Sequence, residues 1–248
     1  MRIKQITTAS AKGIRSYMED YAIQVTSEEG TLVAVFDGHG GHSAAEKAAE
    51  YFPVFFSAEM LLWKSMTASA FRAAIGHLAS TLYPMPSGST LSAVYIPAAE
   101  NVVYTAVLGD SPVLIGNKSE VWFGPDHNVR SNEAEADAAR ARGGFITGGY
   151  LFASLSGQGL QMARALGDFE LNKVLSREPE LQVSLVGEDD FILVATDGLF
   201  DPGHKNFKAS ADAVVELIRN PSTTAQDLVN DALNRQTGDN VTCTLLRL

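Results

Sequence analysis

The sequence predicts an α+β fold in which β-sheets are covered by helices. Apolar runs rich in Val, Ile, Thr and aromatic residues recur along the chain, and many are bounded by Gly, Asp, Ser or Pro, as β-strands are. Segments with helical periodicity come in pairs between groups of these runs. Because regular β-α-β alternation is missing, the pattern favours sheets covered by helices over a doubly wound parallel sheet.

The expected strands are short and separated by turn residues. Each consists of four to eight residues, which is the usual length of a strand in a compact domain. They are expected at residues 21–26, 32–36, 90–96, 101–108, 112–115, 191–196 and 240–246.

Helices are expected between these strands. The first should begin at Ser43, because Ser43 and Glu46 have the spacing of a capping box. In residues 66–82 apolar side chains recur every three or four positions and form one helical face. Residues 133–142 carry acids near the start and arginines near the end, which matches the helix dipole. Two further helices are expected at 211–219 and 223–236.

Length and composition indicate a single domain over residues 1–248. The 29 acidic and 19 basic residues give a net charge of −10, which argues against a nucleic-acid or anionic-lipid surface. No segment has the roughly 18 apolar residues of a membrane span, and the N-terminus lacks the apolar region of a signal peptide. The single cysteine, Cys243, fits a reducing compartment, so a cytoplasmic protein is expected.

Aspartates occur where the strand-like runs end or begin. Asp37, Asp110 and Asp197 follow such runs, and Asp239 precedes the last one. Strands that end at one edge of a sheet would bring these carboxylates together, where they repel one another unless a cation binds or protons are taken up. Oxygen ligands without His or Cys favour Mg²⁺, Mn²⁺ or Ca²⁺ over zinc. Asp-Gly after a strand is also common turn chemistry, so the residues alone predict an acidic metal site and leave the turn interpretation open.

A series of short motifs contains these aspartates. It consists of Gly13-x-Arg15-x-x-Met18-Glu19-Asp20, Phe36-Asp37-Gly38-His39-Gly40-Gly41, Ser87-Gly88-Ser89-Thr90, Leu108-Gly109-Asp110-Ser111, Arg164-Ala165-Leu166-Gly167-Asp168, Asp197-Gly198-Leu199-Phe200-Asp201 and Asp239-Asn240-Val241-Thr242. In this order the motifs resemble those of the metal-dependent protein phosphatases of the type 2C group. The resemblance runs from Thr8 to the C-terminus, and so many motifs in the right order make it specific.

The resemblance implies a four-layer α-β-β-α sandwich of two antiparallel sheets flanked by helices. It implies dephosphorylation of phosphoserine and phosphothreonine in proteins, with two Mg²⁺ or Mn²⁺ ions and a weaker third metal site. Asp37, Asp197 and Asp239 resemble ligands of the first metal, and Asp37 with the carbonyl of Gly38 resembles the second site. The remaining ligands implied are Glu19 and Asp20, partly through water, and Asp110 and Asp201 at the third site.

The resemblance also implies roles for two cationic residues. Arg15 resembles the arginine that clamps the substrate phosphate, the alternative being a surface cation paired with Glu19 or Asp20. Two divalent ions would lower the pKa of a water molecule that attacks phosphorus without a covalent intermediate. His39, close to Asp37 in sequence, could protonate the leaving oxygen, although packing in a tight turn is the alternative. Asp168 is expected to be a structural hydrogen-bond acceptor.

The region near residues 145–161, rich in Gly and aromatics, corresponds to a variable flap that is expected to influence substrate choice. A monomer is expected. Two rival interpretations remain: a pseudophosphatase that binds phosphoproteins without turnover, and a hydrolase of small phosphoesters. The retained metal-ligand acids argue against the first, and the motifs do not distinguish the second.

Overall fold

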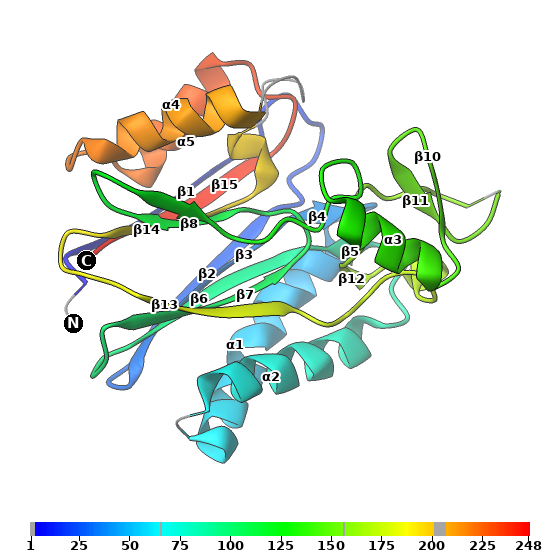
Figure 1. The fold of residues 1–248 in the computed structure, drawn as a ribbon, viewed down its shortest axis with the longest axis horizontal. Helices are drawn as coiled ribbons and strands as arrows, with labels where there is room; N and C mark the ends of the chain where they lie inside the picture. Colours follow the sequence, from blue (N-terminus) through cyan, green and yellow to red (C-terminus); the bar gives the residue numbers. More distant parts are fainter. Residues whose placement is uncertain (1–2, 65, 156, 201–206) are drawn as a thin grey trace.

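A computed structural model describes residues 3–64, 66–155, 157–200 and 207–248. Two antiparallel five-stranded sheets lie face to face at its centre (Figure 1). The first sheet has the order β1 (Gln5–Ala11), β15 (Val241–Arg247), β14 (Phe191–Ala195), β8 (Val113–Gly116) and β9 (Val121–Phe123). The second has the order β13 (Glu180–Leu185), β7 (Val102–Leu108), β6 (Leu91–Pro97), β3 (Gly30–Phe36) and β2 (Tyr21–Thr26).

Strand β3 shows why the central strands have continuous apolar sequences. Leu32, Ala34 and Phe36 pack in the cluster shared with the helices on one side of the sheet. Val33 and Val35 point the other way, into a cluster shared with the first sheet. Since successive side chains on a strand face opposite sides, a strand buried on both faces needs apolar residues throughout.

Two pairs of helices form the outer layers (Figure 1). Helices α1 (Ser43–Trp63) and α2 (Thr67–Leu82) cover the second sheet with an aromatic cluster, in which the rings of Phe56 and Phe71 lie 4.6 Å apart. Helices α4 (Phe207–Arg219) and α5 (Ala225–Asn234) cover the first sheet through residues such as Val214 and Leu228. No helix in the described ranges is long and apolar enough to cross a membrane.

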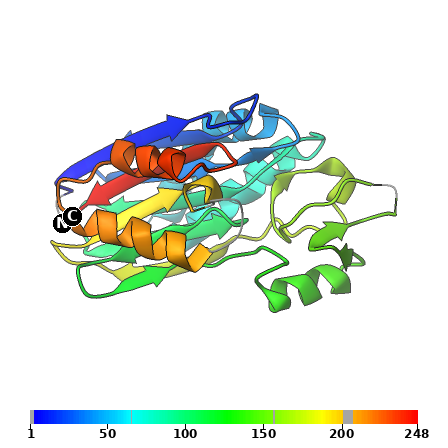
Figure 2. The same cartoon turned by 90° about the horizontal axis from the view of Figure 1, so that it is seen from above.

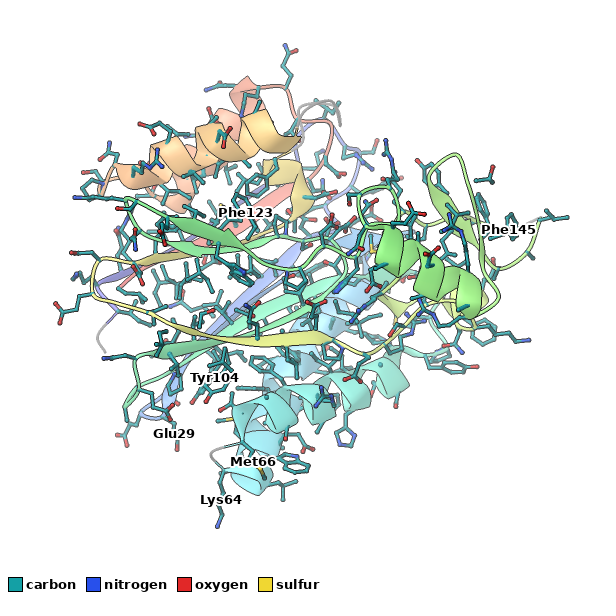
Figure 3. The ribbon with its side chains drawn as sticks, in the orientation of Figure 1. Glu29, Lys64, Met66, Tyr104, Phe123 and Phe145 are labelled. Atoms are coloured by element: carbon teal, nitrogen blue, oxygen red, sulfur yellow. The ribbon has the colours of Figure 1, made fainter. Side chains whose placement is uncertain are left out.

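A lobe beside the sandwich contains the remaining elements (Figure 2). Helix α3 (Glu133–Ala141) and the hairpin of β10 (Phe145–Thr147) and β11 (Tyr150–Phe152) have a small core of their own. Figure 3 shows Phe145 on this lobe, far from Lys64 and Met66 at the tip of the α1–α2 pair. A three-stranded sheet of β12 (Leu166–Gly167), β5 (Gly88–Ser89) and β4 (Gly38–His39) lies where the lobe meets the sandwich.

The predicted α+β sandwich is confirmed, as are all the expected strands and helices, with boundaries shifted by a few residues. The predicted capping box at Ser43 is wrong. Helix α1 begins at Ser43, but the N-cap is His42, whose backbone is already helical and whose side chain makes no capping bond. A capping side chain belongs to the residue before the first helical one, and Ser43 is itself the first helical residue. Ser43 therefore lies one position too late to cap the helix. Strands β1, β9 and β13 of the two main sheets were not predicted, nor were the short strands of the smaller sheets.

Candidate metal and phosphate site

The ends of several strands place the predicted acids at one edge of the sandwich. In the second sheet Tyr21 pairs with Phe36 and Leu91 pairs with Leu108, so Asp20, Asp37 and Asp110 all lie at the same end. In the first sheet Ala195 pairs with Cys243, which brings Asp197 and Asp239 to a common end. The acids of the two sheets also interact with each other.

Asp37 is the centre of this acidic edge. Burial, followed by repulsion from Asp20, Asp197, Asp239 and Asp110, raises the pKa of Asp37 well above its ordinary value. These four neighbours come from segments far apart in sequence, as the strand-end argument predicts. A carboxyl group in this position must take up a proton or gain a cation nearby. An isolated turn aspartate would have no such set of neighbours.

Two neighbouring carboxyl groups show the same effect. Burial raises the pKa of Asp20 to about 7, with repulsion from Asp239 and Glu19 adding to the shift and hydrogen bonds from threonine hydroxyls opposing it. Burial also raises the pKa of Asp110 to about 6, although a hydrogen bond from Asn128 opposes the change. The edge therefore holds several carboxyl groups that are costly to ionise together.

Hydrogen bonds occupy several oxygens of the acid side chains. Thr196 Oγ1 donates to Asp20 Oδ2 at 2.8 Å, and Gly41 N donates to Glu19 Oε1 at 2.7 Å. Asn128 Nδ2 donates to Asp110 Oδ2 at 2.9 Å. Within the described ranges no three Asp, Glu, His or Cys side chains are arranged as a complete metal site. The acids share one edge of the sandwich, and their charges repel one another.

The donor set nevertheless fits a hard divalent cation. Asp37, Asp110, Asp197 and Asp239 are neither fully buried nor fully exposed, so the edge is open to solvent on one side. Carboxylate oxygens without cysteine, in a cluster that resists ionisation, are the chemistry that Mg²⁺ and Mn²⁺ stabilise. Asp201, the other expected ligand of the third site, lies outside the described residues.

Arg15 binds a different acid from the ones considered in the sequence. Its Nη2 donates to Asp239 Oδ2 at 2.7 Å, and its Nε donates to Gly238 O at 2.8 Å. The side chain is 49% exposed. Arg15 thus lies at the open rim of the acidic edge, and among the described residues its Nη1 has no hydrogen-bond partner.

His39 is held by a residue that directly follows another strand, β12. Its Nε2 lies 2.8 Å from Asp168 Oδ2 and 2.9 Å from Oδ1. Asp168 therefore has the hydrogen-bonding role expected of it. His39 is close enough to Asp110 for its charge to lower the pKa of that aspartate.

Asn240 organises the site, and the sequence assigned it no role. Its Oδ1 accepts a bond from Glu19 N at 2.8 Å, and its Nδ2 donates to Lys12 O at 2.8 Å and Tyr17 O at 2.9 Å. These bonds fix the loop that carries Arg15. The motif Asp239-Asn240 is the feature of the sequence that could have indicated this role. An amide side chain can both donate and accept hydrogen bonds, which suits a residue that anchors a loop.

Two glycines permit the close approach of backbone segments. A Cβ on Gly38 would lie 2.5 Å from Glu19 O, and one on Gly198 would lie 1.9 Å from Asn240 O. Glycine is required at both positions because any side chain would push these segments apart. The spacing of the acids depends on this contact.

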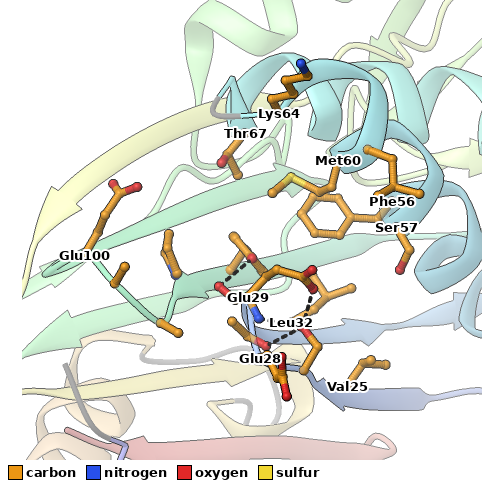
Figure 4. Close-up of a pocket in the computed structure, with 17 residues that line it drawn as sticks. Val25, Glu28, Glu29, Leu32, Phe56, Ser57, Met60, Lys64, Thr67 and Glu100 are labelled. Atoms are coloured by element: carbon orange, nitrogen blue, oxygen red, sulfur yellow. Dashed lines mark hydrogen bonds between the residues drawn. The ribbon is translucent and has the colours of Figure 1, made fainter.

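An apolar hollow lies away from the acidic edge. A cavity of about 660 Å³ is enclosed by the C-terminal part of α1 and the ends of β2, β3 and β6, with Leu32, Phe56 and Met60 on its walls (Figure 4). The predicted site residues that the structure describes do not line it. The apolar cavity is therefore separate from the acidic edge.

Comparison with known proteins gives one consistent result. The family model described as Protein phosphatase 2C matches residues 7–241. The chain is 31% identical over 255 residues to the probable protein phosphatase 2C 69 of Arabidopsis thaliana, with 96% of this chain and 68% of that protein covered. It is 30% identical over 217 residues to the protein phosphatase 2C homolog 2 of Schizosaccharomyces pombe, with 80% and 55% covered. The chain thus spans about half to two thirds of these relatives.

Solved structures share the fold. The serine-threonine phosphatase 2C of Toxoplasma gondii aligns with a TM-score of 0.80 and 19% identity, covering 97% of this chain and 93% of that one. The catalytic domain of the serine threonine protein phosphatase PstP, in complex with two manganese ions, aligns with a TM-score of 0.63 and 22% identity, covering 99% and 98%.

Proposed function

Because the chain belongs to the protein phosphatase 2C family, whose activity is metal-dependent dephosphorylation of serine and threonine in proteins, we propose that its acidic edge holds two divalent cations. The observation that supports this most is Asp37, whose pKa is raised by burial and by four other aspartates. The proposed ligands are Asp37, the carbonyl of Gly38, Asp197 and Asp239, with Glu19 and Asp20 acting partly through water. A third, weaker site would use Asp110 and Asp201.

The cations proposed are Mg²⁺ or Mn²⁺. When bound, they lower the pKa of a water molecule and neutralise phosphoryl oxygens. The side chains of the edge serve this chemistry by position: Asp37 stands between the acids of both sheets, and Asn240 holds the loop with Glu19 against β15. Gly198, after the end of β14, allows the close approach of Asn240 at the start of β15.

Arg15 is the proposed clamp for the substrate phosphate. A guanidinium offers a planar set of donors that suits phosphoryl oxygens, and Arg15 lies half-exposed beside Asp239. Its Nη1 is directed to no described group, so it can donate to a phosphate while Nη2 still binds Asp239. The residue would orient the ester with its phosphorus toward the acids.

His39 is the proposed donor of a proton to the leaving oxygen. Serine and threonine leave as alkoxides, which are poor leaving groups unless a proton is supplied. His39 is two residues from Asp37 in the chain and interacts electrostatically with Asp110. In the proposed reaction this position would bring an ionisable ring close to the ester.

The remaining proposals concern the whole chain. Residues 1–248 would act as one catalytic domain and as a monomer, with the flap near residues 145–161 influencing which phosphoproteins bind. A cytoplasmic location and a role in signalling are part of the proposal. The sequence has a single cysteine, Cys243, which leaves no partner for an intramolecular disulfide and suits a reducing compartment. Burial raises the pKa of its thiol to about 12, so the thiol is unreactive.

The test is hydrolysis of p-nitrophenyl phosphate and of a phosphothreonine peptide with and without metal. Both substrates should be cleaved when Mn²⁺ or Mg²⁺ is added, and EDTA should remove the activity. Activity that persists in EDTA would contradict the proposed metal site. A protein that binds the phosphopeptide in Mn²⁺ without cleaving it would instead be a pseudophosphatase.

A further inference from the structure

The small sheet β12-β5-β4 brings His39 and Asp168 together from distant parts of the chain. Gly88 of β5 pairs with His39 on one side and with Gly167 on the other. Asp168 follows Gly167 directly, so the two polar residues stand on opposite sides of Gly88. Their side chains meet above it, with Nε2 of the ring 2.8 Å from the carboxylate.

Gly88 leaves the space for this contact. A Cβ at position 88 would lie 2.1 Å from Asp168 Oδ2 and 2.2 Å from His39 Nε2. Such distances are far inside van der Waals contact, so any side chain here would separate the pair. The glycine of the Ser87-Gly88-Ser89-Thr90 motif therefore serves the histidine–aspartate contact.

The backbone around Asp168 is fixed in an uncommon conformation. Its φ of 52° and ψ of 57° lie in the left-handed region, which aspartate tolerates better than most residues. Asp168 N donates to Ser87 O at 3.1 Å, which ties the turn to β5. The half-buried guanidinium of Arg177 donates to Ala165 O and Gly167 O, and it interacts favourably with the Asp168 charge. The carboxylate is thus held in place by strand pairing and by a cation.

The contact leaves one ring nitrogen available. Nε2 is taken by Asp168, and among the described residues Nδ1 has no hydrogen-bond partner. The side chain of Asp168 is 8% exposed and that of His39 is 24% exposed, so the carboxylate is shielded while the ring keeps contact with solvent. A carboxylate that accepts from one ring nitrogen fixes both the tautomer and the orientation of the ring.

From this geometry we propose that Asp168 is a positioning residue, which holds the Nε2 side of His39 so that Nδ1 faces the reacting ester. The inference rests on the proposed role of His39. In the reaction, the Nδ1 proton passes to the serine or threonine oxygen as its bond to phosphorus breaks, and the bonding electrons remain on that oxygen. The ring keeps its Nε2 proton, which it donates to Asp168 throughout.

A comparison of leaving groups tests this role. A phosphothreonine peptide needs a proton at its leaving oxygen, whereas p-nitrophenolate is a stable anion and leaves without one. We expect Asp168→Asn and Asp168→Ala to lower kcat for the peptide by roughly 10-fold to 100-fold, as loss of an orienting partner does. For p-nitrophenyl phosphate kcat should fall by less than about threefold. Gly88→Ala should give the same pattern. The added methyl group would separate His39 from Asp168, although neither of these two residues is itself substituted.

The matched control is Glu170→Gln, which changes an exposed acid two residues from Asp168. It should leave both substrates unaffected. In His39→Ala the further change Asp168→Ala should add little to the loss on the peptide, because both residues act through one ring. An equal loss on both substrates would overturn the proposal and assign Asp168 to folding, and so would full activity of the Asp168 variants on the peptide.

Nitrogen-15 NMR of the histidine ring gives a second readout that does not depend on turnover. The His39 signal, identified by its loss in His39→Ala, should report a proton on Nε2, and Asp168→Asn should change that pattern. If the wild-type protein cleaved neither substrate in Mn²⁺, the proposed function would fail, and the ring signal would still decide the contact. An unchanged ring signal in Asp168→Asn would contradict the positioning role.

Discussion

At the residue scale, Asp37 differs from an ordinary turn aspartate because of the carboxylates around it. It follows β3 and is followed by a glycine, as many turn aspartates are. Its pKa is nevertheless raised by burial and by aspartates from both sheets. The position of Asp37 was predictable from the sequence, because apolar strands that end at an acid reveal where the sheet edge lies.

Removing one of the grouped carboxylates should abolish most of the activity. We expect Asp197→Asn to lower kcat by at least about 100-fold, since loss of partners that only support metal ligands already costs 10-fold to 100-fold. The control is Asp189→Asn, because the Asp189 side chain is 95% exposed and lies at the other end of the first sheet. Phosphopeptide assays in Mn²⁺ measure both variants, and near-normal activity of Asp197→Asn would refute the ligand assignment.

Gly198 should tolerate no side chain. A Cβ added at this position would lie 1.9 Å from Asn240 O, a backbone atom that cannot rotate away. We expect Gly198→Ala to lower the free energy of unfolding by about 1–3 kcal/mol, as overpacking does. Gly238→Ala is the control, because a Cβ there meets nothing within 4 Å. Urea unfolding of the two variants compares them, and equal stability would show that the β14–β15 junction can yield.

The supporting polar residues were harder to predict than the acids. Asn240 and Thr196 act by hydrogen bonds to Glu19 and Asp20, which lie more than a hundred residues away in sequence. Apolar patterning reveals which strands exist, but it does not tell which loop a donor will face. The partner of Arg15, Asp239, was missed for the same reason.

At the scale of elements, the strands of the two main sheets that the sequence did not reveal lie at sheet edges. Strands β1 and β9 are the two edges of the first sheet, and β13 is one edge of the second. Half or more of the β13 side chains are exposed, and β1 mixes threonines and serine with few apolar residues. Edge strands often carry polar residues because an apolar open edge would invite aggregation. The central strands, buried on both faces, were visible as apolar runs.

Helix starts give a matched pair of predictions. Thr224 Oγ1 accepts from Asp227 N, and the Asp227 carboxylate accepts from Thr224 N, so α5 has the capping box that α1 lacks. Thr224→Ala should lower the free energy of unfolding by about 1 kcal/mol. Ser43→Ala should change it by less than about 0.5 kcal/mol, because Ser43 makes no capping bond. Chemical denaturation of both variants measures the difference, and a larger loss for Ser43→Ala would contradict the assigned caps.

At the scale of the molecule, the acidic edge joins the two sheets. Asp37 follows a strand of the second sheet, and Asp197 and Asp239 flank strands of the first. Cations bound between them would hold the sandwich together at this end. Metal should therefore stabilise the folded protein, since a ligand that binds only the folded state adds to its stability.

The metal-free protein should lose stability as pH rises from about 5 to about 8. Burial raises the pKa of Asp20 to about 7 and that of Asp110 to about 6, so the folded protein binds more protons than the unfolded chain in this range. Stability then falls with rising pH, because the folded state must release those protons. The melting temperature in EDTA should drop by several degrees. Scanning calorimetry measures it.

The contribution of Asp20 can be isolated with Asp20→Asn, which should flatten the pH dependence in EDTA. This comparison is needed because His127 has an effect of the opposite sign. Burial lowers the pKa of His127, so its contribution to the stability of the folded protein increases as pH rises toward about 6.5. Mn²⁺ should raise the melting temperature of the wild-type protein most at the upper end of the range. A metal-free wild-type protein that became more stable than Asp20→Asn as pH rose would disprove the assigned repulsion.

The pairing of the first and last strands has a mechanical consequence. Lys4 N donates to Arg247 O at 2.8 Å, and the antiparallel ladder runs from Gln5 opposite Arg247 to Ala11 opposite Val241. The two ends of the chain therefore lie side by side (Figure 1). A force that pulls the two ends apart would break the hydrogen bonds between β1 and β15 one pair after another, beginning at Gln5 and Arg247. It would not load all of these bonds at the same time. The rung nearest Arg15 would open last, so β1 must separate from β15 along its whole length before the force reaches the loop that carries Arg15.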